Sequence, residues 1–183
     1  MRVLNVGGGG NRELPSEFAD WDQDILDIDP EVHPDIVCDA LEMKTLPSGT
    51  YDAVWCSHNL EHFYHYQVPT VLAGFLHVLK DDGFAEILVP NLPHVFQAMA
   101  VHNLDLHDVW YRTNHIAVTF HDVIYGWGRA LKQGNGYYAH KCGFSKLSLS
   151  EALQDAGFKS VYIGESGPDL MAKAYRKAGV PCP

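Results

Sequence analysis

Short apolar runs alternate along the chain with longer segments of helical periodicity. Patterns typical of buried strands recur at residues 3–6, 24–28, 35–38, 51–56, 84–89, 160–164 and 170–175. Apolar residues spaced three and four apart predict helices over 68–80, 119–132 and 148–156. This alternation is typical of an α/β protein with a Rossmann-like, doubly wound and mainly parallel sheet of seven strands.

Two connections depart from that pattern. Only residues 29–34 separate the second predicted strand from the third, fewer than the dozen or so that a helical crossover needs. We therefore predict that this helix is missing or reduced to a turn. Residues 92–147 are too long for a plain connection, and we predict an inserted helical segment there that covers the substrate. The whole chain, residues 1–183, is predicted to form a single domain.

Four consecutive glycines, residues 7–10, follow the first predicted strand directly. Glycine adopts backbone conformations that other residues avoid, and a turn without side chains lets a ligand lie against the backbone. A glycine loop that simply joins a strand to a helix is the alternative. The choice between them depends on what the neighbouring strands carry.

Acidic residues end the next two predicted strands. Asp27 follows the glycines by about twenty residues, where an acid in a nucleotide-binding βαβ unit accepts hydrogen bonds from ribose hydroxyls. Asp39 ends the third strand at the same edge, where a carboxylate can accept a hydrogen bond from the adenine amine. Either acid alone could be a helix cap or a solvated turn residue. Together with the glycines, they indicate a nucleotide-like ligand.

Five motifs occur in a fixed order along the chain: NVGGGG at 5–10, LDIDP at 26–30, VCDALEMKTLPSGTYDAVWCSHNLEHF at 37–63, VLKDDGFAEILVPN at 78–91 and LSEALQDAGF at 149–158. This ordered set resembles the class I S-adenosylmethionine-dependent methyltransferases, particularly the small predicted methyltransferases of the type 11-like group. The resemblance covers most of the chain outside residues 92–140. It implies S-adenosyl-L-methionine (AdoMet) as the cofactor and methyl transfer as the activity.

The resemblance also implies the residues of the cofactor site. Gly7 and Gly9 would flank the methionine moiety, and Asp27 would hold the ribose. Asp39 and Ala40 would border the adenine. The full predicted set is Asn5, Gly7, Gly8, Gly9, Asp27, Ile28, Asp39, Ala40, Ser57, His58 and Leu60. Asn5 is a departure, because this fold often has Asp or Glu there, and the amino group of the methionine moiety would lose a charge partner.

Two other classes of protein match parts of the sequence less well. A dinucleotide-binding GxGxxG motif needs a third glycine, but the chain has Arg12 or Glu13 there, depending on where the count begins. Residues 58–62 match HxxEH, a zinc-peptidase pattern, but they directly follow a buried strand and no third ligand is identifiable from spacing. NAD chemistry and peptidase activity are therefore disfavoured.

The segment at residues 58–62 also looks like a loop of ubiquinone-pathway O-methyltransferases, in which acidic and histidine residues can hold a divalent cation. His58 stands where that pattern has an acid. We therefore predict no metal, and the sequence leaves open whether a cation binds near His58, Glu61 and His62.

Methyl transfer from a sulfonium requires few protein groups, because alignment and the removal of one proton account for most of the catalysis. Imidazole titrates near neutral pH, so we predict His58, His62 and His115 as catalytic residues. His121 and His140 are further candidates for the base. Asn91, after the fifth predicted strand, is a candidate for orienting the acceptor, with an ordinary turn residue as the alternative.

Residues 92–147 are rich in aromatic and histidine side chains, which suit stacking on a sugar or ring. They are Trp110, Tyr111, His115, His121, Tyr125, Trp127, Tyr137, Tyr138 and His140, with Lys141 beside them. A small core or a dimer contact is the alternative.

Because similar methyltransferases are often associated with glycan or natural-product assembly, the resemblance implies O-methylation of a sugar, glycan precursor or natural-product-like acceptor. A non-catalytic AdoMet- or S-adenosylhomocysteine-binding or scaffolding protein is the other hypothesis, because Asn5 and the short crossover could mark a degenerate site.

Charge and composition limit the classes of binding partner and the cellular location that we expect. The net charge of −10 without a basic run disfavours nucleic acid and anionic lipid, and favours a small-molecule substrate, with a possible homodimer. No apolar run approaches the 18 or so residues of a membrane span, and no signal peptide is recognisable. The cysteines form no CxxC pair, which indicates reduced thiols. We therefore expect a cytoplasmic protein.

Overall fold

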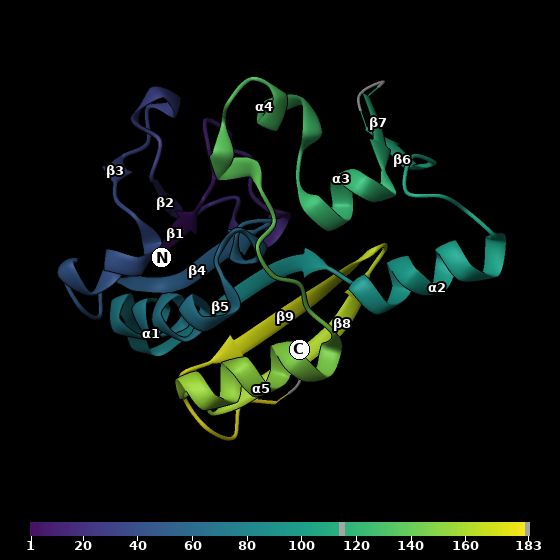
Figure 1. Ribbon diagram of the computed structural model, residues 1–183. Helices are drawn as coiled ribbons and strands as arrows, with labels where there is room; N and C mark the ends of the chain where they lie inside the picture. Colours follow the sequence, from purple (N-terminus) through teal and green to yellow (C-terminus); the bar gives the residue numbers. More distant parts are fainter. Residues whose placement is uncertain (114–115, 182–183) are drawn as a thin grey trace.

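A seven-stranded sheet forms the centre of the protein (Figure 1). The structure, a computed structural model, describes residues 1–113 and 116–181. The strand order is β3-β2-β1-β4-β5-β9-β8. The strands are β1 (Arg2–Val6), β2 (Asp22–Asp27), β3 (Ile36–Val37), β4 (Tyr51–Ser57), β5 (Leu79–Pro90), β8 (Ser160–Ser166) and β9 (Asp169–Tyr175). Strands β1 to β5 are parallel and β9 is antiparallel to both of its neighbours, so the predicted mainly parallel, Rossmann-like sheet is confirmed.

Two helices pack on one face of this sheet. They are α1 (Val68–Val78) and α5 (Lys146–Ala156), and both lie on the lower side of the sheet in Figure 1. Phe75 of α1 and Leu149 of α5 are fully buried with Val54 and Ile87 of the sheet in one apolar cluster. Helix α5 begins where the Ser145 side chain accepts a hydrogen bond from the Ser148 backbone N–H. Both predicted helices are confirmed, with ends shifted by two residues.

The first crossovers contain no α-helix. The connection from β2 to β3 is a 3₁₀ turn, Pro30–Val32, as its length predicts. The connection from β1 to β2 also has only a 3₁₀ turn, Ser16–Phe18, although the sequence there is long enough for a helix. Phe18 packs instead against Val3 and Trp55 and makes an edge-to-face contact with Trp21, with ring centroids 5.1 Å apart. These aromatic side chains cover the second face of the sheet where a helix would otherwise lie.

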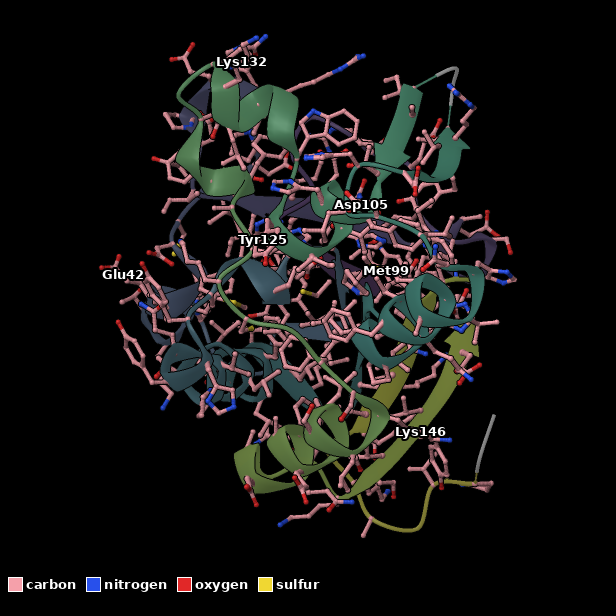
Figure 2. All side chains as sticks on the ribbon, turned by 45° about the vertical axis from the view of Figure 1, so that its right-hand side comes forward. Glu42, Met99, Asp105, Tyr125, Lys132 and Lys146 are labelled. Atoms are coloured by element: carbon pink, nitrogen blue, oxygen red, sulfur yellow. The ribbon has the colours of Figure 1, made fainter. Side chains whose placement is uncertain are left out.

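Residues 92–145 lie between β5 and α5 in the sequence and form a layer separate from the central sheet. They are hereafter called the 92–145 segment. They contain α2 (Leu92–His102), β6 (Val109–Thr113), β7 (Ile116–Thr119), α3 (Phe120–Tyr125), α4 (Gly128–Lys132) and a 3₁₀ turn, Gly136–Tyr138. Figure 1 shows α3, α4 and the β6–β7 hairpin on the side of the sheet away from α1 and α5, and Figure 2 labels Met99, Asp105, Tyr125 and Lys132 of the same segment. The segment therefore mixes helices with a hairpin that the sequence pattern did not predict.

The predicted helix over 119–132 is wrong as a continuous element. It breaks at Gly126, which has φ +103° and separates α3 from α4. A Cβ on Gly126 would lie 2.0 Å from the Tyr138 carbonyl oxygen, because Gly126 forms a β-bridge with Ala139. This close approach of two backbones is what interrupts the helix.

None of the helices in the described ranges is long and apolar enough to cross a lipid bilayer.

Candidate cofactor site

A cavity of about 270 Å³ opens where the parallel strands end. One wall comes from the glycine turn after β1 and from the ends of β2 and β3. A second wall comes from the loop after β4, and a third comes from the end of the 92–145 segment. Ligands of open α/β sheets bind in the crevice outside the carboxyl ends of the strands, and this cavity has that position.

The glycine turn is shaped by left-handed backbone at Gly7 (φ +72°) and Gly9 (φ +57°). A Cβ on Gly7 would lie 2.1 Å from Asn59 Nδ2, and one on Gly8 would lie 2.6 Å from Asn5 Nδ2. No atom of the described residues lies within 4 Å of the corresponding position at Gly9. Gly7 and Gly8 are therefore needed for packing, whereas Gly9 leaves bare backbone beside the cavity.

Asp27 fixes the turn from the end of β2. Its Oδ2 accepts a hydrogen bond from the Gly9 N–H at 3.0 Å, and its Oδ1 accepts one from the Asp29 N–H at 2.9 Å. Asp39 Oδ1 likewise accepts from the Leu41 N–H at 2.9 Å, at the start of a 3₁₀ turn. Both acids also line the cavity. The capping role and the position in the ligand wall, which the sequence offered as alternatives, are therefore compatible.

The structure brings most of the predicted cofactor residues to the cavity wall: Gly7, Gly9, Asp27, Ile28, Asp39, Ala40 and His58. Gly8 and Ser57 are not part of the wall. Asn5 and Leu60 are buried, Asn5 beneath the glycine turn and Leu60 in the apolar core. Asn91 is also buried, and its side chain accepts a hydrogen bond from the His94 N–H at the start of α2. These residues support the site from outside the cavity.

Sequence reasoning missed several wall residues. Asn59, Phe63, Tyr64 and Gln67 follow His58 in the loop after β4, and Asn135 comes from the 92–145 segment. Tyr137, Tyr138 and Lys141 had been predicted to cover a substrate, and they line the same cavity. Tyr125 and Trp127, from the same predicted set, are not in its wall. The sequence did offer a signal for these missed residues. The first four lie shortly after His58, and Asn135 lies just before the YYAHK stretch at 137–141.

His58 lies between two carboxylates at the edge of the cavity. Its Nδ1 is 3.5 Å from Glu61 Oε1, and its Nε2 is 3.5 Å from Asp169 Oδ2. Burial would lower the pKa of His58, but the contacts with Asp169 and Glu61 outweigh it and raise that pKa to about 10. His58 is therefore an imidazolium at neutral pH, although 42% of its side chain is exposed.

This raised pKa predicts lower stability at alkaline pH. A histidine has a pKa near 6.5 in an unfolded chain and about 10 at position 58 here. The contribution of His58 is therefore fully present below about pH 6.5 and is lost as the pH rises through about 10. We expect the free energy of unfolding, measured by urea denaturation, to decrease across this window, and His58→Gln to flatten the decrease. The exposed His102 provides a control, since His102→Gln should keep the wild-type slope; a His58→Gln slope equal to wild type would contradict the prediction.

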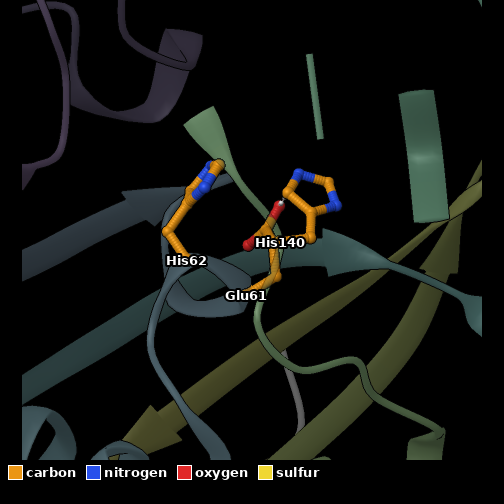
Figure 3. Close-up of side chains that lie close together, drawn as sticks. All are labelled: Glu61, His62 and His140. Atoms are coloured by element: carbon orange, nitrogen blue, oxygen red, sulfur yellow. Dashed lines mark ion pairs between the residues drawn. The ribbon is translucent and has the colours of Figure 1, made fainter. Parts of the chain in front are cut away.

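The other predicted catalytic histidines are placed differently. His62 lines the cavity, but its Nδ1 is 3.0 Å from the Ala139 carbonyl oxygen and its Nε2 is 3.1 Å from the His58 carbonyl oxygen. His115 lies outside the described residues. His140 contacts the Val123 carbonyl oxygen through Nδ1 at 2.9 Å, and its Nε2 is 3.9 Å from Glu61 Oε1 (Figure 3).

The backbone at Glu61 ties the 92–145 segment to the loop after β4. The N–H groups of Lys141 and Cys142 both donate to the Glu61 carbonyl oxygen, at 2.8 Å and 3.2 Å. The side chain of Glu61 is 2% exposed. Burial would raise the pKa of this carboxyl, but His58, followed by His62 and His140, outweighs burial and lowers the pKa. The third wall of the cavity is therefore held beside an ionised, buried carboxylate.

The strand order, the glycine turn and the acid at the end of β2 together define a protein of the α/β class that binds an adenosine-containing cofactor. A family model described as a methyltransferase domain matches residues 1–163. The chain belongs to this family of methyltransferase domains. It is an S-adenosylmethionine-dependent methyltransferase, and AdoMet is its cofactor.

Solved structures share this fold at low sequence identity. An S-adenosylmethionine-dependent methyltransferase from Archaeoglobus fulgidus is 17% identical with a TM-score of 0.60, covering 95% of this chain and 85% of its own. An O-methyltransferase family protein from Burkholderia thailandensis is 14% identical with a TM-score of 0.62, over 98% of this chain and 52% of its own. The 1,6-didemethyltoxoflavin-N1-methyltransferase of the same organism is 15% identical with a TM-score of 0.55, over 97% and 71%. No curated protein matches the chain.

The residues of the cavity fit AdoMet. A carboxylate offers about four acceptor positions, and the backbone occupies two of them at Asp27, so Asp27 can still accept from ribose hydroxyls. Asp39 accepts one backbone N–H and keeps acceptor capacity for an adenine amine. The open space at Gly9 leaves room for a group lying on the backbone.

Proposed function

We propose that the protein O-methylates a small acceptor that carries hydroxyl groups, such as a sugar, a glycan precursor or a natural-product-like compound. The observation that carries this proposal is the composition of the cavity wall beside the predicted cofactor residues. That part of the wall consists of aromatic, amide and basic residues: Tyr64, Gln67, Asn135, Tyr137, Tyr138 and Lys141. Aromatic faces beside hydrogen-bonding groups suit a polar ring.

Hydrogen bonds and a cation–ring contact fix the conformation of this part of the wall. Asn135 Oδ1 accepts a hydrogen bond from the Tyr137 N–H at 3.2 Å and so fixes the 3₁₀ turn that carries both tyrosines. Lys141 is fixed through its backbone N–H to Glu61, and its Nζ lies 5.4 Å from the centre of the Tyr64 ring. A preordered wall aligns an acceptor without a further loss of entropy on binding.

When bound, AdoMet supplies a methyl group on a sulfonium, and the protein aligns the acceptor oxygen and excludes water. We retain His58 as the candidate catalytic residue at the cavity. Because it is protonated at neutral pH, it suits orienting the acceptor by donating a hydrogen bond rather than removing a proton, and the hydroxyl proton would pass to water as the methyl group is attached. His62 uses both ring nitrogens on backbone carbonyls, which favours a positioning role for it.

A small-molecule acceptor is further supported by one structural neighbour. The N1-methyltransferase from Burkholderia thailandensis contains bound 1,6-didemethyltoxoflavin together with S-adenosylhomocysteine. Within this proposal the chain is one domain, residues 1–183, and the 92–147 insertion covers the acceptor. The cytoplasmic location and the possible homodimer stay predictions from the sequence.

The proposed acceptor wall is tested by Tyr137→Ala and Tyr138→Ala. AdoMet-dependent formation of S-adenosylhomocysteine is measured across a panel of sugars, nucleotide sugars and phenols, with product mass to locate the methyl group. Loss of one stacking ring at about 1.4 kcal/mol corresponds to about a tenfold decrease in kcat/KM. The affinity for S-adenosylhomocysteine, measured by calorimetry, should stay within about threefold of wild type.

Tyr125→Ala is the matched control, because Tyr125 is an exposed tyrosine of the same segment outside the cavity wall. It should leave turnover unchanged. A parallel decrease of cofactor affinity in Tyr137→Ala would assign that ring to the cofactor and contradict its role in acceptor binding. Turnover restricted to acceptors methylated at nitrogen would contradict O-methylation.

A further inference from the structure

Glu61 is a buried carboxylate whose side-chain oxygens accept no hydrogen bond from the described residues. Neither Oε1 nor Oε2 has a hydrogen-bond partner among the residues that the structure describes, and the residue is 1% exposed. The imidazole nitrogens of His58 and His140 are the cationic or polar groups beside it, at 3.5 Å and 3.9 Å, beyond good hydrogen-bonding distance. Glu61 therefore keeps acceptor capacity for a further positive partner beside the His58 imidazolium.

Two imidazoles beside Glu61 each have their Nδ1 close to a backbone carbonyl oxygen. His140 Nδ1 lies 2.9 Å from the Val123 carbonyl oxygen, and His62 Nδ1 lies 3.0 Å from the Ala139 carbonyl oxygen. A carbonyl only accepts, so the Nδ1 of His140 carries the hydrogen, whereas His62 faces a carbonyl oxygen through both ring nitrogens. A histidine that binds a metal typically donates its other ring N–H to such a carbonyl, which leaves Nε2 as the ligand atom.

The remaining nitrogens support the same interpretation. With its Nδ1 facing the Val123 carbonyl oxygen, His140 has its other ring nitrogen, Nε2, 3.9 Å from Glu61 Oε1. His62 Nε2 lies 3.1 Å from the His58 carbonyl oxygen. In a neutral His62 protonated at Nδ1, two lone pairs would face each other there. A cation between them, or a second proton on the ring, removes this repulsion.

We propose that Glu61, His62 and His140 form a binding site for a divalent transition-metal ion of the Zn²⁺ type. Each of the three residues offers a ligand atom, and these atoms all lie within 4.8 Å of one another (Figure 3). The three groups draw together on binding, because zinc lies about 2.0–2.2 Å from nitrogen and oxygen ligands. Two imidazoles and one carboxylate favour Zn²⁺ and related ions over Mg²⁺, which prefers oxygen ligands.

This ligand set differs from the one that the HxxEH pattern suggested. In place of His58, whose imidazole lies between Glu61 and Asp169, the third ligand is His140, which belongs to the 92–145 segment. A metal at this site would join the loop after β4 to the stretch that places Tyr138 and Lys141 in the cavity wall. It would neutralise Glu61 and hold that wall in position, whatever acceptor the cavity takes.

The test measures metal binding directly, without methyl transfer. The full-length chain, freed of any affinity tag, is stripped with a chelator and equilibrated with Zn²⁺ alone, and bound zinc is counted by mass spectrometry after gel filtration. We expect about one zinc per wild-type chain. His140→Gln and Glu61→Gln should weaken zinc binding by at least about 100-fold, whereas His102→Gln, an exposed histidine on α2, should bind as wild type. Excess Mg²⁺ should not displace the zinc.

Two further measurements keep the outcome decisive. Retained binding of S-adenosylhomocysteine shows that a variant is folded, and His140→Gln decides the question if Glu61→Gln does not fold. The Co²⁺-substituted protein should show the visible bands of nitrogen and oxygen ligation. A strong thiolate-to-cobalt band, wild-type zinc binding in His140→Gln, or no zinc in the wild type would each overturn the proposal. Loss of S-adenosylhomocysteine binding by the wild type would contradict the cofactor site and leave the metal count interpretable.

Discussion

Gly7→Ala is expected to decrease the affinity for AdoMet by about 100-fold or more and to destabilise the fold. The left-handed backbone at φ +72° costs an alanine about 1–2 kcal/mol. The new Cβ would also overlap the Asn59 side chain, whose Nδ2, Cγ and Cβ lie 2.1, 2.3 and 2.8 Å away. Overpacking of this kind adds about 1–3 kcal/mol, and relief of the overlap moves the turn that forms the cofactor wall. Calorimetric titration with S-adenosylhomocysteine and thermal unfolding measure the two effects.

Gly49→Ala separates the strain from the overlap. Gly49 has a similar backbone, with φ +62°, but in the described part of the chain nothing lies within 4 Å of its Cβ position, and it is not in the cavity wall. We therefore expect only the loss of about 1–2 kcal/mol in the free energy of unfolding, with unchanged cofactor affinity. If Gly7→Ala and Gly49→Ala behave alike, the packing of Gly7 on Asn59 has no part in cofactor binding.

Asp27→Ala is expected to weaken AdoMet binding by about 10- to 100-fold. Hydrogen bonds to a charged group contribute about 1.5–3 kcal/mol, and the variant loses those from the ribose hydroxyls. It also releases the N–H groups of Gly9 and Asp29, so the glycine turn loses its anchor on β2. Calorimetry gives the affinity. In wild type, AdoMet at about 100 times its Kd should add roughly 2.7 kcal/mol of apparent stability in thermal unfolding, and NAD should add none.

Asp29→Ala is the matched control for this position. Asp29 also lines the cavity, but its Oδ1 accepts from the Glu31 N–H within the 3₁₀ turn that follows and does not contact the glycine turn among the described hydrogen bonds. We expect its effect on cofactor affinity to be small. A large decrease in Asp29→Ala together with unchanged affinity in Asp27→Ala would move the ribose contact to Asp29.

Much of the sheet was predictable because its signals are local. A buried parallel strand shows as a short apolar run, and α1 shows as apolar residues at helical spacing, so neither requires knowledge of distant residues. The absence of a helix between β2 and β3 was predictable from length alone. The absence of a helix between β1 and β2 was not, because it depends on Phe18 and Trp21 packing against Val3 and Trp55 across the sheet.

The sequence by itself determined the class of fold and the cofactor end of the site. Gly7, Gly9, Asp27 and Asp39 each lie at the end of a strand or within three residues after it, and parallel strands bring their carboxyl ends to one edge of the sheet. Their arrangement therefore follows from the strand pattern and the rules of parallel sheets.

Only the tertiary structure decided which residues complete the site. His140 and Lys141 reach the cavity region because backbone hydrogen bonds from Lys141 and Cys142 to Glu61 join segments far apart in the sequence. The same fold places His58 between Glu61 and Asp169, which raises the pKa of His58 and makes it a cation. Such contacts leave no periodic trace along the chain, because they depend on how separate layers pack and on which charges burial brings together.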